Sequence, residues 1–245
     1  MCGRFSLAVE PEVLRQHFKL SITTEEMEMR LPRYNIAPSQ PLLAVVASAS
    51  PESGSLQRRA TYFRWGLVPA WRKVFQGGWI NARAETAAEK PAFRAALRRR
   101  RCLIPADGFY EWTGSGKPRQ PYWIHLREKT PSGWRKQPVF AFAGIWERWQ
   151  GSEGTVVETC AILNTTANRL MQVLHERMPV ILSEQDYECW LDPQIQDPQV
   201  LLPLLRPYPC AAMVAYPVSI HVNFPHHEDP ACQEPVGDPI LLPAP

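Results

Sequence analysis

The chain has 245 residues, of which 45% are hydrophobic and 21% are charged, and its net charge is +3. This length and composition are enough for one large domain or two small ones. The sequence contains no secretory signal and no apolar run near the ~20 residues of a membrane-spanning helix, so we expect a cytoplasmic protein without a membrane partner. With so small a net charge, any polyanion must bind to a local basic face.

The predicted elements are short, and strands outnumber helices. In chain order they are a helix at 12–18, strands at 42–47 and 60–65, a helix at 91–100, strands at 102–105, 108–112, 122–126, 139–145 and 157–163, a helix at 168–175, a strand at 179–182, a helix at 184–191 and a strand at 213–218. Strands and helices do not alternate regularly, which favours an α+β fold. We expect a single domain with a curved antiparallel or mixed, barrel-like sheet and a few flanking helices.

We expect this domain to span residues 2–223 and a Pro-rich C-terminal tail to span 224–245, where the periodicity of a packed element is missing. The Ser, Gly and Pro residues of 49–59 indicate a surface loop.

The six cysteines are scattered without Cys-x-x-Cys pairs. This spacing argues against a zinc site and against a disulfide framework, and a reducing compartment fits it best. The adjacent His226 and His227 are weak indications of a metal site. We therefore expect no metal and no cofactor.

The N-terminus carries the most specific chemistry. Removal of Met1 would leave Cys2 with a free amine and a thiol on adjacent carbons, and this pair can trap an aldehyde as a thiazolidine. Both groups titrate near neutrality, with ordinary pKa values of about 8 for the amine and about 8.5 for the thiol. A second-position cysteine without any role is the alternative.

Polar residues also interrupt aromatic segments. Asn81, Arg83 and Glu85 alternate as on one face of an extended segment. Glu111 lies among aromatic residues, a setting that raises a carboxyl pKa and suits a general acid; a surface glutamate at a strand edge is the alternative. His175 lies at a helix end, where catalytic groups emerge but where capping and packing are also common.

A run of arginines at 98–101 favours either a solvated helix face or a contact to single-stranded DNA.

Together, the short motifs of this chain resemble the SOS response-associated peptidase (SRAP) family, whose members are also called abasic-site processing proteins and covalently shield abasic sites in single-stranded DNA. The bacterial form of the pattern is the more similar one. The motifs are Cys2-Gly3-Arg4-Phe5, Arg33-Tyr34-Asn35-Ile36-Ala37-Pro38, Arg64-Trp65-Gly66-Leu67-Val68-Pro69, Asn81-Ala82-Arg83-Ala84-Glu85-Thr86, Asp107-Gly108-Phe109-Tyr110-Glu111-Trp112 and His175-Glu176-Arg177-Met178-Pro179.

The resemblance implies a division of roles in the site. Cys2 is the nucleophile and forms a thiazolidine with the ring-opened sugar. His175 helps to open the sugar ring, Glu111 transfers protons, and Asn81 positions the amine of Cys2. The residues expected on the DNA side are Arg4 and Arg83 at phosphates, and Asn35, Pro38, Trp65 and Trp112 along the channel.

The implied partner is single-stranded DNA that contains abasic sites, bound by a monomer at damaged DNA in the bacterial nucleoid, with no small-molecule cofactor. Lyase-like activity and autocatalytic removal of Met1 are possible side reactions. Two other functions stay open. One is a cysteine peptidase that uses Cys2 with His175 and Glu111. The other is a non-covalent reader of modified bases, with Trp65 and Trp112 caging an extruded base.

Overall fold

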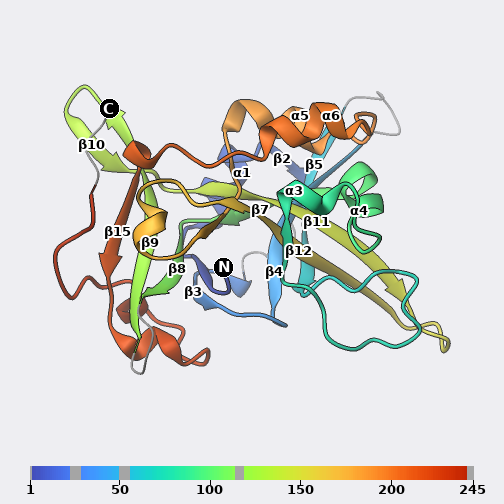
Figure 1. The fold of residues 1–245 in the computed structure, drawn as a ribbon, viewed down its shortest axis with the longest axis horizontal. Coiled ribbons are helices and arrows are strands. Elements are labelled where there is room, and N and C mark those ends of the chain that lie inside the picture. The colour runs from blue at the N-terminus through green and yellow to red at the C-terminus, as the bar shows by residue number, and fades with distance from the viewer. Residues whose placement is uncertain (1, 23–28, 50–55, 114–118, 242–245) are drawn as a thin grey trace.

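The structure is a computed structural model that describes residues 2–22, 29–49, 56–113 and 119–241 (Figure 1). Strand accounts for 43% and helix for 21% of it, which confirms the expected α+β class. Within these residues two sheets pack against each other, with short helices at their edges. No described helix has the length and apolar character needed to cross a membrane.

The larger sheet closes into a barrel, as the sequence predicts. Its strands follow the order β12, β11, β7, β4 and β5, and β5 then pairs in parallel with β12. Four further strands attach to it, β2, β6, β13 and β14. The bounds are β2 (Leu20–Ile22), β4 (Pro41–Ala49), β5 (Leu56–Trp65), β6 (Asn81–Arg83), β7 (Arg101–Ala106), β11 (Phe140–Gln150), β12 (Val156–Thr166), β13 (Arg177–Pro179) and β14 (Ile181–Leu182).

The second sheet is antiparallel and carries the N-terminal strand. Its described strands follow the order β10, β9, β8, β1 and β3, and β15 pairs with β9. The bounds are β1 (Phe5–Leu7), β3 (Arg33–Ile36), β8 (Gly108–Thr113), β9 (Gln120–Thr130), β10 (Gly133–Lys136) and β15 (Met213–Pro217).

The two sheets share one apolar core at β1. The Phe5 ring lies edge-on to Trp65 of the barrel at 5.3 Å and to Phe142 at 5.7 Å. All three side chains are buried, and such T-shaped pairs add to the free energy gained by burial. Figure 1 shows the N-terminus in the middle of the molecule, between the second sheet and β4 of the barrel. Cys2, which precedes β1 and accepts a hydrogen bond from Asn81 of the barrel strand β6, lies where the two sheets meet.

The helices are short. They are α1 (Pro11–His17), α3 (Ala84–Ala87), α4 (Arg94–Arg99), α5 (Tyr187–Leu191) and α6 (Pro198–Leu201), and the 3-10 helices are η1 (Met171–Val173), η2 (Glu184–Asp186), η3 (Leu202–Leu204), η4 (Cys210–Ala212), η5 (Ile220–Asn223) and η6 (Pro230–Cys232).

Two local predictions are wrong. The helix expected at 168–175 is only the 3-10 turn η1, because the Asn168 side chain accepts a hydrogen bond from the Met171 amide and donates to the Tyr208 carbonyl. Such side-chain bonds compete with regular helix. The loop expected at 49–59 is narrower, since Ala49 ends β4 and Leu56–Arg59 belong to β5, while 50–55 lie outside the described residues.

The Pro-rich segment after Asn223 folds back onto the second sheet. Ile240 forms a β-bridge with Ala215 and Pro235 one with Val218. Cys232 in η6 is fully buried. Residues 224–241 therefore contact the remainder of the chain, and the domain boundary at 223 stays a prediction.

Candidate functional site

Cys2 lies just ahead of β1 and is fully buried. Its thiol donates to the Arg4 carbonyl oxygen at 3.8 Å, and its own carbonyl accepts a hydrogen bond of 2.9 Å from Asn81 Nδ2. Asn81 begins β6, where it pairs with Ile162 of β12. The barrel thus holds Asn81 against Cys2, so two of the predicted catalytic residues are in direct contact.

The other end of the Asn81 amide is unsatisfied. Its Oδ1 atom is buried and has no hydrogen-bond partner in the described part of the chain. A buried acceptor without a donor costs about 1–3 kcal/mol, and such groups are rare in native proteins. This acceptor beside Cys2 is therefore able to accept a hydrogen bond from a donor that takes part in chemistry at Cys2.

Glu111 is the second group that acts on Cys2. It lies on β8, opposite Tyr122 of β9, and its carboxylate is buried and accepts from the Trp112 amide at 3.3 Å. Burial, and after it the negative charge of Glu111, raise the pKa of the Cys2 thiol to about 12. The Cys2 thiol is therefore protonated at neutral pH, and a base must take its proton before the sulfur can react.

His175 follows η1 and precedes β13, and it is partly exposed. Its Nδ1 accepts a hydrogen bond of 2.9 Å from the Arg177 amide. A neutral imidazole that accepts at Nδ1 carries its proton on Nε2, and we assign this tautomer from the hydrogen bond. His175 therefore presents an N–H donor to a substrate. The structure brings His175 to the same end of β12 as β6, since β13 and β6 flank this strand.

Arg177 joins two of the sequence motifs, a role that the sequence reasoning missed. Its guanidinium donates twice to the Glu85 carboxylate, at 2.8 Å each, and also to Asn164 Oδ1 of β12. The hydrogen bond from Arg177 lowers the pKa of Glu85. Glu85 is thus committed to Arg177, whereas Arg83, paired beside Asn164, is exposed and available to a phosphate.

Arg4 is held in place by Asn35 and by the C-terminal segment, residues 219–241. Its NH1 atom donates to Asn35 Oδ1 at 2.7 Å and to the Val222 carbonyl at 2.9 Å, and its guanidinium lies 5.8 Å from the centre of the Trp112 ring. The Nε atom of Arg4 is buried without a hydrogen-bond partner in the described part of the chain. This N–H is a donor that a phosphate oxygen can satisfy.

The remaining predicted DNA residues differ in accessibility. Pro38 is exposed at the turn after β3, where Ser39 has a φ of 70°. Asn35 is buried, and its amide donates to the carbonyls of Val222, Phe224 and His227.

Trp65 is also fully buried, and its Nε1 donates to the Ile80 carbonyl at 2.9 Å. Trp112 is partly exposed, with its Nε1 bound to Asn223 Oδ1 at 2.7 Å. Direct contacts of Asn35 and Trp65 with DNA stay predictions. In this structure both side chains are buried and donate hydrogen bonds to backbone carbonyls.

The arginine run is divided between surface and core. Arg98 and Arg99 are exposed, and Arg100 pairs with Glu147 at 2.7 Å. Arg101 is buried and donates to the carbonyls of Leu97, Arg98, Trp190 and Asp192, which joins α4 to the end of α5. Arg101 is therefore a structural residue, and the exposed positive charge of the run is smaller than the sequence indicates.

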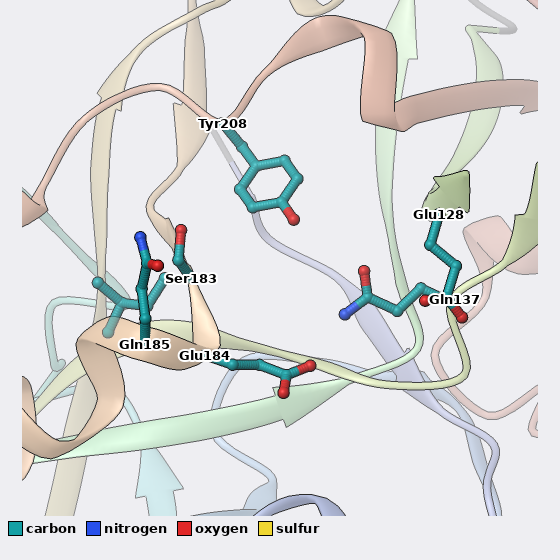
Figure 2. Close-up of a pocket in the computed structure, with 7 residues that line it drawn as sticks. Glu128, Gln137, Ser183, Glu184, Gln185 and Tyr208 are labelled. Atoms are coloured by element: carbon teal, nitrogen blue, oxygen red, sulfur yellow. The ribbon is translucent and has the colours of Figure 1, made fainter. Parts of the chain in front are cut away.

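Figure 2 shows a pocket of about 440 Å³ that contains none of the predicted site residues. Its polar lining comes from Glu128, Gln137, Glu184 and Tyr208, among others, with the Glu128 and Glu184 side chains reaching in from separate elements. Two carboxylates repel phosphate, so this pocket does not suit the DNA backbone.

Comparisons with known proteins show the family of this chain. The family model described as SOS response associated peptidase (SRAP) matches residues 1–225. Abasic site processing protein YoqW of Bacillus subtilis is 42% identical over 233 residues, which are 94% of this chain and 97% of that protein.

A more distant relative has the same description, and one solved structure has a similar fold. Abasic site processing protein HMCES of Gallus gallus is 31% identical over 226 residues, which are 84% of this chain and 66% of that protein. A crystal structure of a protein from Bacteroides thetaiotaomicron superposes with a TM-score of 0.78 at 27% identity, over 96% of this chain and 100% of that one.

Proposed function

The chain belongs to the SOS response-associated peptidase family, and from that membership we propose that it captures abasic sites in single-stranded DNA through a covalent bond to Cys2. The relatives named abasic site processing proteins support the DNA lesion as the target. The observation that carries the proposal is the contact of Cys2 with Asn81, beside the Glu111 carboxylate.

The reaction begins with the open-chain sugar aldehyde. After removal of Met1, the α-amine of Cys2 attacks C1′, and loss of water gives an imine. The Cys2 sulfur then adds to the imine carbon, the thiol proton leaves, and the imine nitrogen gains a proton, which closes the thiazolidine. Holding both groups against one aldehyde makes the attack intramolecular, an advantage of up to ~7–11 kcal/mol.

Each nearby side chain has one part in this sequence. Asn81 Oδ1, which has no partner among the described residues, accepts a hydrogen bond from the Cys2 amine and so aims it. Glu111 takes the proton of the Cys2 thiol as the ring closes, because that thiol is not ionised at neutral pH. His175, with its proton on Nε2, donates to the ring oxygen of the closed sugar and promotes its opening. These proton transfers require no cofactor.

The flanking DNA binds to the surface between the two sheets. Arg4 and Arg83 hold phosphates, and the exposed Pro38 and the partly exposed Trp112 lie against the bases. Stacking of a base on such a side chain contributes about 1–3 kcal/mol. A rigid proline at the tip of a turn blocks a continuing duplex, so single strands and strand junctions are the preferred substrates.

The properties of the thiol disfavour a general cysteine peptidase. Such an enzyme needs a thiolate near neutral pH, whereas burial raises the pKa of Cys2 to about 12. A reader of modified bases is also disfavoured, because the Trp65 ring is fully buried and cannot form one wall of a base cage without repacking the core.

The direct test is a mixture of the purified protein, lacking Met1, with a single-stranded oligonucleotide that carries one abasic site. We expect a heat-stable adduct on a denaturing gel, and intact mass should equal protein plus DNA minus one water. Cys2→Ala should lose the adduct, whereas Cys189→Ala, a change at a partly exposed cysteine of α5, should keep it. An adduct that persists in Cys2→Ala would overturn the proposal, and so would the absence of an adduct with the protein that lacks Met1 and is otherwise unaltered.

A second measurement separates the amine from the thiol. Cys2→Ser retains the amine, so it should form an imine that borohydride reduces to a stable adduct, but no heat-stable adduct without borohydride. His175→Ala should slow capture of the closed sugar by roughly 10²-fold or more, the lower end for a lost general acid.

A further inference from the structure

The segment of 219–232 places three metal-ligating side chains together, away from the residues used above for catalysis. Ser219 Oγ caps η5 by accepting from the His221 amide at 3.2 Å, and Asp229 Oδ1 caps η6 by accepting from the Ala231 amide at 3.0 Å. These caps hold the His221 ring and the second oxygen of Asp229 toward each other. Cys232 ends η6, directly across from them.

The three donor atoms already converge. His221 Nε2 lies 2.9 Å from Asp229 Oδ2, and the ligand atoms of His221, Asp229 and Cys232 all lie within 4.8 Å of one another. The Cys232 side chain is buried and its thiol donates to the His227 carbonyl at 3.5 Å, so it has one fixed rotamer on the inner side of the cluster.

The His221 ring is also held in place by His227, which is not one of the three converging side chains. The ring of His227 stacks on it with centroids 3.7 Å apart, and His227 Nδ1 is 2.7 Å from the His221 carbonyl. Packing and hydrogen bonds that orient the ligands are typical of metal sites, where they keep the donors in place before the ion binds.

We propose that His221, Asp229 and Cys232 form a site for one divalent zinc ion. An imidazole nitrogen, a carboxylate oxygen and a thiolate are all ligands of zinc, at about 2.0–2.3 Å from the ion, and tetrahedral geometry then places the donors roughly 3.3–3.8 Å apart. The present spread of up to 4.8 Å requires a contraction of about 1 Å when the ion binds. A water molecule completes the coordination.

Zinc binding exchanges protons of the ligands for bonds to the ion. The S–H bond of Cys232 breaks and a zinc–sulfur bond forms, and the proton passes to solvent. The Nε2–H of His221 gives up its hydrogen bond to Asp229 and passes its proton to solvent, while Nδ1 takes up another proton, so that neutral His221 binds zinc through the Nε2 lone pair. No oxidant or reductant takes part.

The ion would tie η5 to η6 and so stiffen the segment that supports Arg4. The Val222 carbonyl holds Arg4 and Asn35, and the His227 carbonyl holds Asn35 as well. The metal site itself does not depend on the reaction at Cys2. Only its effect on DNA affinity rests on the proposed function.

Cobalt(II) titration of the metal-free protein tests the site, because a cobalt–thiolate bond gives a charge-transfer band in the near ultraviolet. Cys2 must be controlled for, since its amine and thiol also chelate metals, so the titration is run on Cys2→Ala as well as on the unaltered chain. We expect Cys2→Ala to bind one equivalent of cobalt with a thiolate band, and zinc to displace that band.

Variants assign the ligands. Added to Cys2→Ala, Cys232→Ser should remove the thiolate band, and His221→Asn should weaken zinc binding by more than about 10–100-fold, the effect of losing even an outer-shell partner. The matched controls Cys210→Ser and His226→Asn should keep both band and affinity, because neither residue belongs to the cluster.

Folding is checked separately by circular dichroism without metal, and zinc should raise the melting temperature of the control variants but not of Cys232→Ser or His221→Asn. Absence of a thiolate band in Cys2→Ala, or a band that survives when Cys232→Ser is added to Cys2→Ala, would overturn the site. Neither result bears on covalent capture by Cys2, so the two proposals fail independently.

Discussion

Glu228 offers the sharpest test of how the C-terminal segment supports the site. Its Oε1 atom accepts from the backbone amides of Tyr34 and Asn35, at 2.5 and 2.8 Å, and its Oε2 atom accepts from Arg33 at 2.9 Å. Glu228→Ala removes all three bonds and leaves two amides of β3 without this acceptor. We expect the strand that carries Asn35 to loosen.

The expected loss can be sized from these contacts. A hydrogen bond to a charged group contributes about 1.5–3 kcal/mol, and orphaned buried amides add to the cost. The Glu228 side chain is 30% exposed, so water replaces part of what is lost and screens the Arg33 pair. We expect a loss of about 2–4 kcal/mol in the free energy of unfolding, or a fall of roughly 4–16 °C in melting temperature for a chain of this size.

Urea denaturation followed by tryptophan fluorescence measures this loss. The matched control is Glu128→Ala, which removes a carboxylate paired with Arg135 at 2.8 Å on the surface, where side-chain exposures are 40% and 69%. Exposed pairs contribute about 0–1 kcal/mol. Equal destabilisation by the two variants would refute the role of Glu228. Glu228→Ala should also weaken binding of the abasic strand through Arg4, while the adduct still forms at saturating DNA.

Further predictions concern single side chains. Glu111→Gln should slow crosslinking by about 10²–10⁴-fold with DNA affinity unchanged in fluorescence anisotropy; an unchanged rate would remove Glu111 as the base. Asn81→Leu should slow it by roughly 100-fold, the cost of a misplacement of about 1 Å, and a normal rate would show that the amide does not aim the amine. Arg101→Met should destabilise the fold by at least about 3 kcal/mol in urea, because buried carbonyls lose their donor; a smaller loss would mean that water reaches them. Glu85 has a lowered pKa through its bond from Arg177, so its contribution is present at neutral pH and is lost as the pH falls through the folded-state pKa. The unaltered chain should therefore be more stable than Glu85→Gln above the ordinary pKa of 4.5, and this difference in the free energy of unfolding should disappear below that pH. The difference should stay under about 1 kcal/mol because Glu85 is half exposed. A difference that grows in acid would contradict this sign.

Apolar strands with a continuous run of buried residues were predictable, and strands of three or four residues were not. The strands expected at 102–105 and 108–112 appear as β7 and β8, because both are nearly continuous runs of residues that are buried in the structure. β1 and β3 have three and four residues, too few for a periodic pattern, and their pairing comes from contacts distant in sequence.

Buried polar residues mark the limit of prediction for the site. The motifs located Cys2, Asn81 and Glu111, whose chemistry is local to each segment. The environment of Arg4 was beyond reach, because its acceptors Asn35 and Val222 lie 31 and 218 positions away. The absence of Cys-x-x-Cys pairs likewise says nothing about a cluster such as that of His221, whose ligands differ in type and come from two turns.

The position of Cys2 between the sheets gives a buried residue the neighbours that its proposed role as nucleophile needs. The barrel supplies Asn81, the second sheet supplies Glu111, and the C-terminal segment orients Arg4, two residues after Cys2. Burial keeps the thiol protonated and so protects it from oxidation, which proceeds through the thiolate. Within the described part of the chain, the same burial leaves Asn81 Oδ1 without a partner, a cost that a bound amine relieves. On the proposed function, the site is inert until an aldehyde and the amine of Cys2 meet in it, and its selectivity for abasic DNA follows from that requirement rather than from an unusually reactive sulfur.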